Sequence, residues 1–277
     1  MMSRKLLKYL LIGIVATLIA TFLLPKKEDA TVNTPRDYEA ILQSGVLRAT
    51  TEYNAISYYV DGDTVSGLHY ELLQAFAQAH GLQVELTPEM SFEKRMQGLC
   101  NGEFDLIAHG IQNTIELKDT LLLSAPILRN RQVLVQREPT SLNDSNYIKS
   151  HLELAGKTLH VVKGSPSILR IHNLSNEIAD TIYIKEVANY GSEQLLSLVA
   201  HGDIDYAVCD ESVARAMIDS LPQIDIHTAI SFSQFYSWGV NKQSPALLDS
   251  LNQWLRSYKQ TKEYKQLIKK YRHASLY

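Results

Sequence analysis

The stretch VAHGDIDYAVCDES, residues 199–212, decides the fold of this chain. An apolar helix end leads into the turn His201-Gly202-Asp203, and a short buried strand over 204–209 then places Asp210 at its carboxyl end. Open α/β sheets bind ligands at the carboxyl ends of their strands. The sequence therefore predicts that Asp210 lies where a positively charged group of a ligand would bind.

The same pattern occurs earlier in the chain, in LCNGEFDLIAHG, residues 99–110. It again gives a helix end, a glycine turn, an acidic residue and a buried strand, with His109 as the polar residue at the strand end. Two copies of one unit predict two α/β lobes that face a common cleft. The acidic residues before the two strands are expected to be turn and cap residues only; they are Glu103, Asp105, Asp203 and Asp205.

Composition and charge narrow the functional class. A chain of 277 residues with 45% hydrophobic and 21% charged residues is typical of a globular protein with one large or two modest domains. The net charge is −3 and no basic stripe follows the first thirty residues, so nucleic acid is not an expected partner.

Cys100 and Cys209 occupy corresponding places in the two repeats and are expected to be free thiols. No cluster has metal-ligand spacing, so neither a metal nor a cofactor is expected.

The first thirty residues are typical of an export segment. Basic residues precede an uncharged apolar run over 9–24, which ends at Pro25-Lys26-Lys27. Either a cleaved signal peptide or an uncleaved membrane anchor fits this pattern, and the lack of a clear small-residue cleavage site favours the anchor. With a tether over 31–43, the body of the protein is expected to work in the periplasm, held to the cytoplasmic membrane.

If residues 1–30 are an anchor, the exported protein is expected to stay in the membrane fraction after a high-salt wash. Its first residue is then Met1 or Met2. Fractionation followed by N-terminal sequencing checks this, and a soluble periplasmic form that begins near Ala30 would contradict it.

The segment after the tether predicts a βαβαβ unit with parallel strands. Its elements are a short helix over 38–43, a strand over 46–51, a hairpin at Asp61-Gly62-Asp63, a helix from 67 to 81, a strand over 82–87, a helix over 92–99 and a strand over 104–109.

Seven segments in this order resemble solute-binding protein family 3 over about residues 44–273: VLRATTEY, GLHYELLQAFAQAHGLQVEL, MQGLCNGEFDLIAHG, LLLSAPILRNRQVLVQRE, ELAGKTLHVVKGSPS, LLSLVAHGDIDYAVCDES and KEYKQLIKKYRH. Within that family, the first two segments are most similar to the N-terminal, non-catalytic domain of membrane-bound lytic transglycosylase F. That enzyme continues into a lysozyme-like catalytic domain. This chain, which ends at Tyr277, is expected to lack that domain and not to be an enzyme.

The resemblance implies a two-lobed α/β clamshell of the periplasmic-binding-protein type II, in which each lobe is a mostly parallel sheet flanked by helices. Carried onto this chain, the first lobe holds residues 44–136 plus 237–277, and the second lobe with the hinge segments holds 137–236. Two hinge crossovers are expected near 131–137 and 231–237. The C-terminal helices, over 245–258 and 262–272, are expected to pack on the first lobe.

The resemblance also implies ligand contacts. In family members that bind amino acids, an acid matching Asp210 holds the ammonium group and an Arg holds the carboxylate, but Leu117 stands at the Arg position here. Without a bidentate guanidinium, recognition of ordinary α-amino acids is not implied. The other expected ligand contacts are Tyr53, Tyr58, His109, Gly110, Gln112, Ser165 and Ser167.

Each of these contacts has a structural alternative. Tyr53 and Tyr58 are either aromatic walls or packing residues, and His109 is either a ligand contact or a structural histidine. Ser165, before Pro166, either binds or only caps a helix whose free N–H groups suit an anion.

The sequence therefore predicts an exported, membrane-tethered protein that captures a small polar solute between two lobes, for transport through a permease or for signalling. The solute is expected to be amino-acid-like or a peptidoglycan fragment. The alternative is a regulatory or sensory module of the lytic transglycosylase F type, which acts on a cell-wall enzyme without a catalytic domain of its own. A triad of Asp210, His109 and Ser165 is not favoured, because Ser165 lacks a G-x-S-x-G elbow and mobile lobes give no fixed geometry.

Overall fold

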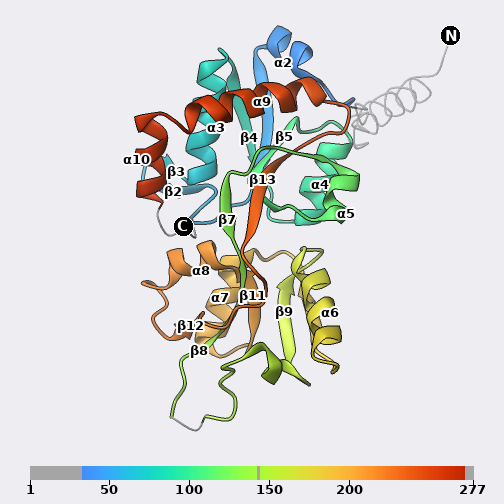
Figure 1. The fold of residues 1–277 in the computed structure, drawn as a ribbon. Coiled ribbons are helices and arrows are strands. Elements are labelled where there is room, and N and C mark those ends of the chain that lie inside the picture. The colour runs from blue at the N-terminus through green and yellow to red at the C-terminus, as the bar shows by residue number, and fades with distance from the viewer. Residues whose placement is uncertain (1–32, 142–143, 272–277) are drawn as a thin grey trace, which may run out of the picture. The chain divides into compact units, whose positions relative to one another are not determined.

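The first lobe is built around a six-stranded sheet in the computed structural model, which describes residues 33–141 and 144–271 (Figure 1). The strand order is β4-β1-β5-β13-β6, and β7 pairs with β13. Strands β4, β1 and β5 are parallel, whereas β13 is antiparallel to its neighbours. The strands are β1 (Val46–Thr51), β4 (Gln83–Pro88), β5 (Leu106–Gln112), β6 (Leu122–Leu123), β7 (Leu128–Asn130) and β13 (Gln234–Val240).

Helices and one hairpin surround this sheet. They are α2 (Tyr38–Ser44), the hairpin β2 (Tyr59–Asp61) and β3 (Thr64–Ser66), α3 (Leu68–Ala79), α4 (Phe92–Cys100), α5 (Ile115–Thr120), α9 (Pro245–Tyr258) and α10 (Lys262–Lys270). The apolar stripe of α9 packs in one buried cluster with Phe76 of α3 and Trp238 of β13. The C-terminal helices therefore contribute to the core of the first lobe, although they follow the second lobe in sequence.

The second lobe has a five-stranded sheet with the order β10-β9-β11-β8-β12. Here β10, β9 and β11 are parallel, and β8 is antiparallel to β11 and β12. The elements are β8 (Gln132–Arg137), a 3-10 turn (His151–Leu154), β9 (Thr158–Val162), α6 (Ser167–Glu177), β10 (Tyr183–Val187), α7 (Ser192–His201), β11 (Ala207–Asp210), α8 (Glu211–Met217) and β12 (Ile224–Asp225). Both sheets are thus mixed, because β13 in the first sheet and β8 in the second run antiparallel to the three parallel strands of their sheet.

The two sequence repeats fold as the same local unit. Helices α4 and α7 each lead to a glycine with positive φ, Gly102 at 78° and Gly202 at 83°. This left-handed region favours glycine, which has no Cβ. Both strands begin later than the sequence predicts, because the N–H groups of Phe104 and Ile204 still donate to carbonyls near the ends of the helices.

The chain passes between the two sheets at Arg131, which separates β7 from β8, and again between β12 and β13. Next to the first crossover, Asn130 Nδ2 donates to Ser212 Oγ at 2.8 Å and Arg131 Nε donates to Glu211 at 2.6 Å. These bonds fix the crossover against helix α8. The lobe boundaries themselves stay a prediction.

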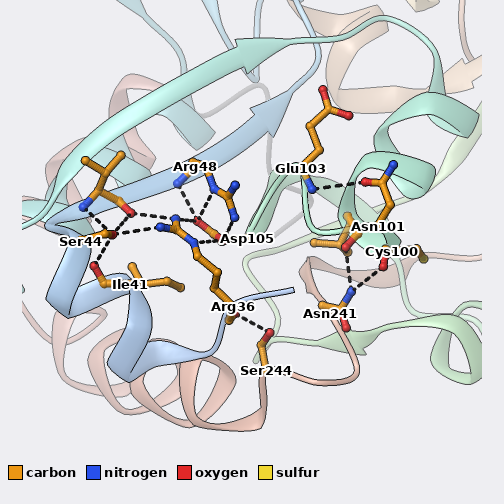
Figure 2. A network of polar contacts seen from close by, with 12 residues as sticks. Arg36, Ile41, Ser44, Arg48, Cys100, Asn101, Glu103, Asp105, Asn241 and Ser244 are labelled. Carbon is orange, nitrogen blue, oxygen red and sulfur yellow. Dashed lines mark hydrogen bonds and ion pairs between the residues drawn. The ribbon is translucent and has the colours of Figure 1, made fainter. Parts of the chain in front are cut away.

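Asp105, one of the expected turn residues, joins distant segments of the first lobe (Figure 2). Its buried carboxylate accepts hydrogen bonds from Arg36 Nε at 3.0 Å, from Arg48 Nη2 at 2.9 Å and from the Arg48 backbone N–H at 2.8 Å. The corresponding residue of the second repeat, Asp205, has a side chain 69% exposed and pairs with Arg137. Equivalent positions in the two repeats therefore differ: the carboxylate is buried between two arginines in the first and exposed beside one arginine in the second.

In residues 33–141 and 144–271, no helix is long and apolar enough to cross a membrane. The expected export segment, residues 1–30, lies outside the described residues, as does the start of the expected tether.

Candidate functional site

A cavity of about 60 Å³ lies at the carboxyl ends of strands from both sheets. It is lined by residues of β5, by residues that follow β1 and β9, and by the last residues of β11. The lining residues are Glu52, Phe92, Arg95, His109, Gly110, Ile111, Gln112, Gln132, Val162, Ser165, Pro166, Ser167, Ser192, Val208, Cys209, Asp210 and Tyr236. This is the position at which open α/β sheets bind ligands.

The structure brings six of the eight expected ligand contacts together in this lining: His109, Gly110, Gln112, Ser165, Ser167 and Asp210. Tyr53 and Tyr58 are not part of it. Their rings meet edge to face at 5.9 Å, and Tyr58 meets Tyr70 in the same way at 5.7 Å. Tyr53 is 39% exposed, so these rings form an aromatic row outside the cavity, and their role as ligand contacts stays a prediction.

Asp210 ends β11 and accepts a hydrogen bond at Oδ1 from the hydroxyl of Tyr236, at 2.7 Å. Tyr236 belongs to β13 of the first lobe, so this bond joins the two lobes across the cavity. Burial raises the pKa of Asp210 to about 7, with Glu52 contributing in the same direction and the Tyr236 hydrogen bond opposing it. The carboxyl group therefore changes its charge near neutral pH.

Glu52 and Arg95 form a buried ion pair in the lining that sequence reasoning missed. Arg95 Nη2 donates to Glu52 Oε2 at 3.0 Å, and Arg95 Nη1 donates to the backbone carbonyl of Glu89. Burial lowers the pKa of Arg95, while Glu52 opposes that shift. The strand-end rule that selects Asp210 also selects Glu52, which directly follows β1, but no sequence signal marks Arg95.

Two histidines in ring contact, His109 of the cavity lining and His69 next to it, are neutral at pH 7. Trp238 Nε1 donates to Nδ1 of His69 at 2.9 Å, and burial lowers the pKa of His69 to about 3, with His109 contributing. His109 Nδ1 lies 3.0 Å from Ser57 Oγ, and burial together with Arg95 lowers its pKa well below the usual value. At Gly110 a Cβ would stand 3.3 Å from Tyr236 Cδ1 and 3.4 Å from His69 Nε2, so the glycine leaves room for both rings.

Two buried oxygens of the lining have no hydrogen-bond partner among the described residues: Gln132 Oε1 and Ser165 Oγ. The amide nitrogen of Gln132 donates to Ser167 Oγ at 2.9 Å, and that of Gln112 donates to Gln234 at 2.5 Å. Helix α6 begins at Ser167 without a side-chain cap. Ser165 therefore neither caps this helix nor contacts a base, which removes the geometric basis for a nucleophilic serine.

Leu117, which the resemblance to the family aligns with a carboxylate-binding arginine, does not line the cavity. It packs against the buried cluster of Leu99, Ile107, Ile111 and Leu121. The side chain at this position therefore contributes to the first-lobe core.

In the part of the chain that the structure describes, no group of three or more His, Cys, Asp or Glu side chains is placed to hold a metal ion. Cys100 is exposed and Cys209 is buried in the cavity wall, and both are free thiols.

Comparisons with known proteins agree with this architecture. The sequence model of the bacterial extracellular solute-binding proteins, family 3, matches residues 47–274. The membrane-bound lytic murein transglycosylase F of Photobacterium profundum is 31% identical over 241 residues, which cover 85% of this chain and 45% of that enzyme. The chain thus spans about half the length of the curated relatives it matches.

Two solved structures show the same fold. A mutant of the arginine-binding protein from T. maritima matches with a TM-score of 0.72 and 24% identity, over 84% of this chain and 97% of that one. An ancestral arginine-binding protein bound to glutamine matches with a TM-score of 0.71 and 27% identity, over 82% of this chain and 97% of that one. The expected two-lobed α/β fold of the type II periplasmic binding proteins is confirmed.

Proposed function

The chain belongs to family 3 of the bacterial extracellular solute-binding proteins, and from this premise we propose that it captures a small polar ligand between its two lobes, in the periplasm. The observation that carries the proposal is the cavity at the strand ends, to which each lobe contributes a carboxyl group. Glu52 comes from the first lobe and Asp210 from the second. A ligand that contacts both would favour the closed arrangement of the lobes.

Contacts between the lobes next to the cavity support ligand-linked closure. The Tyr236 hydroxyl of the first lobe reaches Asp210 of the second. The backbone N–H of Ala55, in the first lobe, donates to Glu193 at 2.6 Å, in the first turn of α7 of the second lobe. Ligand binding and lobe contact thus involve the same strand ends, which is the arrangement of a hinge-closing binding protein.

Saturating ligand is expected to reduce the radius of gyration, because closure buries surface from both lobes. Small-angle scattering of the purified protein, with and without a solute identified by binding, measures this change. An unchanged profile at saturation would contradict closure while leaving the fold intact.

The output of ligand capture is either delivery to a transporter permease or regulation of cell-wall metabolism. The resemblance to lytic murein transglycosylase F supports the second possibility, in which the chain acts as a sensory module for a peptidoglycan-cleaving enzyme. In both cases residues 1–30 are proposed to hold the protein at the cytoplasmic membrane. Affinity purification from crosslinked cells separates the two, since a permease is recovered in the first case and a cell-wall enzyme in the second.

A further inference from the structure

Three side chains of the cavity that carry nitrogen donors, Arg95, Gln112 and Gln132, already donate to protein acceptors. Arg95 donates to Glu52 and to the carbonyl of Glu89. The amides of Gln112 and Gln132 donate to Gln234 and Ser167. A ligand carboxylate that replaced Glu52 at Arg95 Nη2 would leave a buried carboxylate without its cation, which is costly.

Several side-chain oxygens of the cavity accept no hydrogen bond from the protein among the described residues. Gln132 is only 3% exposed, and its side-chain oxygen Oε1 has no hydrogen-bond partner among the described residues. Within residues 33–141 and 144–271, Arg95 uses only Oε2 of Glu52, and Tyr236 uses only Oδ1 of Asp210. A buried acceptor left without a donor costs free energy, so this set of oxygens is suited to N–H donors from a ligand.

The charges lead to the same conclusion. The carboxyl groups of Glu52 and Asp210 face the single guanidinium of Arg95 in this lining, while burial lowers the pKa of His109 and of the nearby His69 and keeps both neutral. The N-terminus of helix α6 adds a positive end equivalent to about half a charge. Half a positive charge does not balance the second of the two carboxyl groups. Glu193 of α7 adds a further acidic group near Glu52.

We propose, on the basis of the proposed ligand capture, that the ligand is a small organic cation without a carboxylate group, whose ammonium or guanidinium N–H groups donate to Asp210, to Glu52 and to the side-chain oxygen of Gln132. The chemical class comprises small amines, diamines and guanidino compounds.

Pairs of compounds that differ only in the carboxylate test the ligand class. Isothermal titration calorimetry of the full chain at pH 8 compares agmatine with arginine, and putrescine with ornithine. In each pair the compound without the carboxylate is expected to bind tighter by about tenfold or more, because the carboxylate meets an already negative cavity. Equal or tighter binding of both amino acids overturns the proposal, as does the failure of all four compounds to bind.

Two glutamines of one strand provide matched variants. Both lie in β8 and are buried, but Gln136 is fully bonded: its amide donates to the carbonyl of Ile148, and its oxygen accepts from the N–H of Ile148. Gln132→Met is expected to weaken binding of the tighter amine about tenfold or more, because a hydrogen bond to a charged group is lost. Gln136→Met is expected to lower the melting temperature with unchanged affinity. Equal amine affinity in wild type and Gln132→Met overturns the role of Gln132.

The binding and scattering results together distinguish a wrong ligand class from a wrong proposal of ligand capture. If the amines fail but another solute binds and compacts the protein in scattering, the ligand class is wrong and the proposed function stands. If no solute in a broad screen binds or compacts the protein, the proposed function fails as well.

Discussion

Asp105→Asn is expected to lower the free energy of unfolding by about 3 kcal/mol, at the lower end of the cost of breaking a buried ion pair. The carboxylate is fully buried, whereas the side chains of Arg36 and Arg48 are each 21% exposed. Water can therefore partly solvate the two guanidinium groups when they lose their anionic partner. The substitution keeps the shape of the side chain and removes its charge. The bonds that join Arg36, the start of β1 and the start of β5 are then weakened together (Figure 2).

The second repeat offers the matched control for this substitution. Asp205 stands at the equivalent position, but its side chain is 69% exposed and its partner Arg137 is 40% exposed. Asp205→Asn is expected to cost less than about 1 kcal/mol, the usual range for a surface pair. Urea denaturation of both variants at pH 7 measures the difference. Similar losses in the two would mean that the Asp105 network contributes no more than a surface ion pair.

Asp210→Asn is expected to weaken binding of a cationic ligand by about 1.5 to 3 kcal/mol, roughly ten- to a hundredfold, because a charge-assisted hydrogen bond is lost at a half-buried carboxyl of the cavity. The variant keeps the shape of the side chain and retains an oxygen that accepts from Tyr236. Asp203→Asn, which changes an exposed acid in the same stretch of sequence, is the control and is expected to leave affinity unchanged.

Calorimetry with the tightest-binding solute checks this expectation, and melting temperatures verify that both variants fold. Equal affinity of wild type and Asp210→Asn would show that Asp210 is a structural residue at the strand end. The ligand would then bind elsewhere in the cleft.

The pH dependence of binding follows from the same carboxyl group. Because burial raises the pKa of Asp210 to about 7, the group is mostly protonated and neutral at pH 6 and mostly ionised at pH 8. The facing groups are Glu52, Cys209 and Tyr236; burial raises the pKa of Cys209 and of Tyr236 well above the usual values, so both stay protonated in this range. Affinity for a cation is expected to rise about tenfold from pH 6 to pH 8.

Titrations at several pH values with wild type and Asp210→Asn measure this effect. The variant is expected to show a flat profile between pH 6 and pH 8. A wild-type affinity that falls as the pH rises would contradict the assignment of the titrating group to a carboxyl that binds a cation.

The sequence by itself determined the local units of this protein. The strand over 46–51 and the helix over 245–258 have the predicted bounds, because hydrophobic periodicity and helix-ending residues act over a few neighbours. The repeated glycine turns predicted two similar β–α units, and the strand-end rule placed His109 and Asp210 in the cavity. These conclusions need only contacts between residues that are close in sequence.

Only the tertiary structure decided which groups meet in the cavity. Arg95 pairs with Glu52 across 43 positions, and Tyr236 reaches Asp210 from a strand of the other lobe. Leu117 turned out to pack in the first-lobe core. A pattern along the chain fixes where a strand ends, but it does not specify the partner of each side chain there. That choice depends on burial and on the competition of donors for acceptors, which arise only when distant segments pack together.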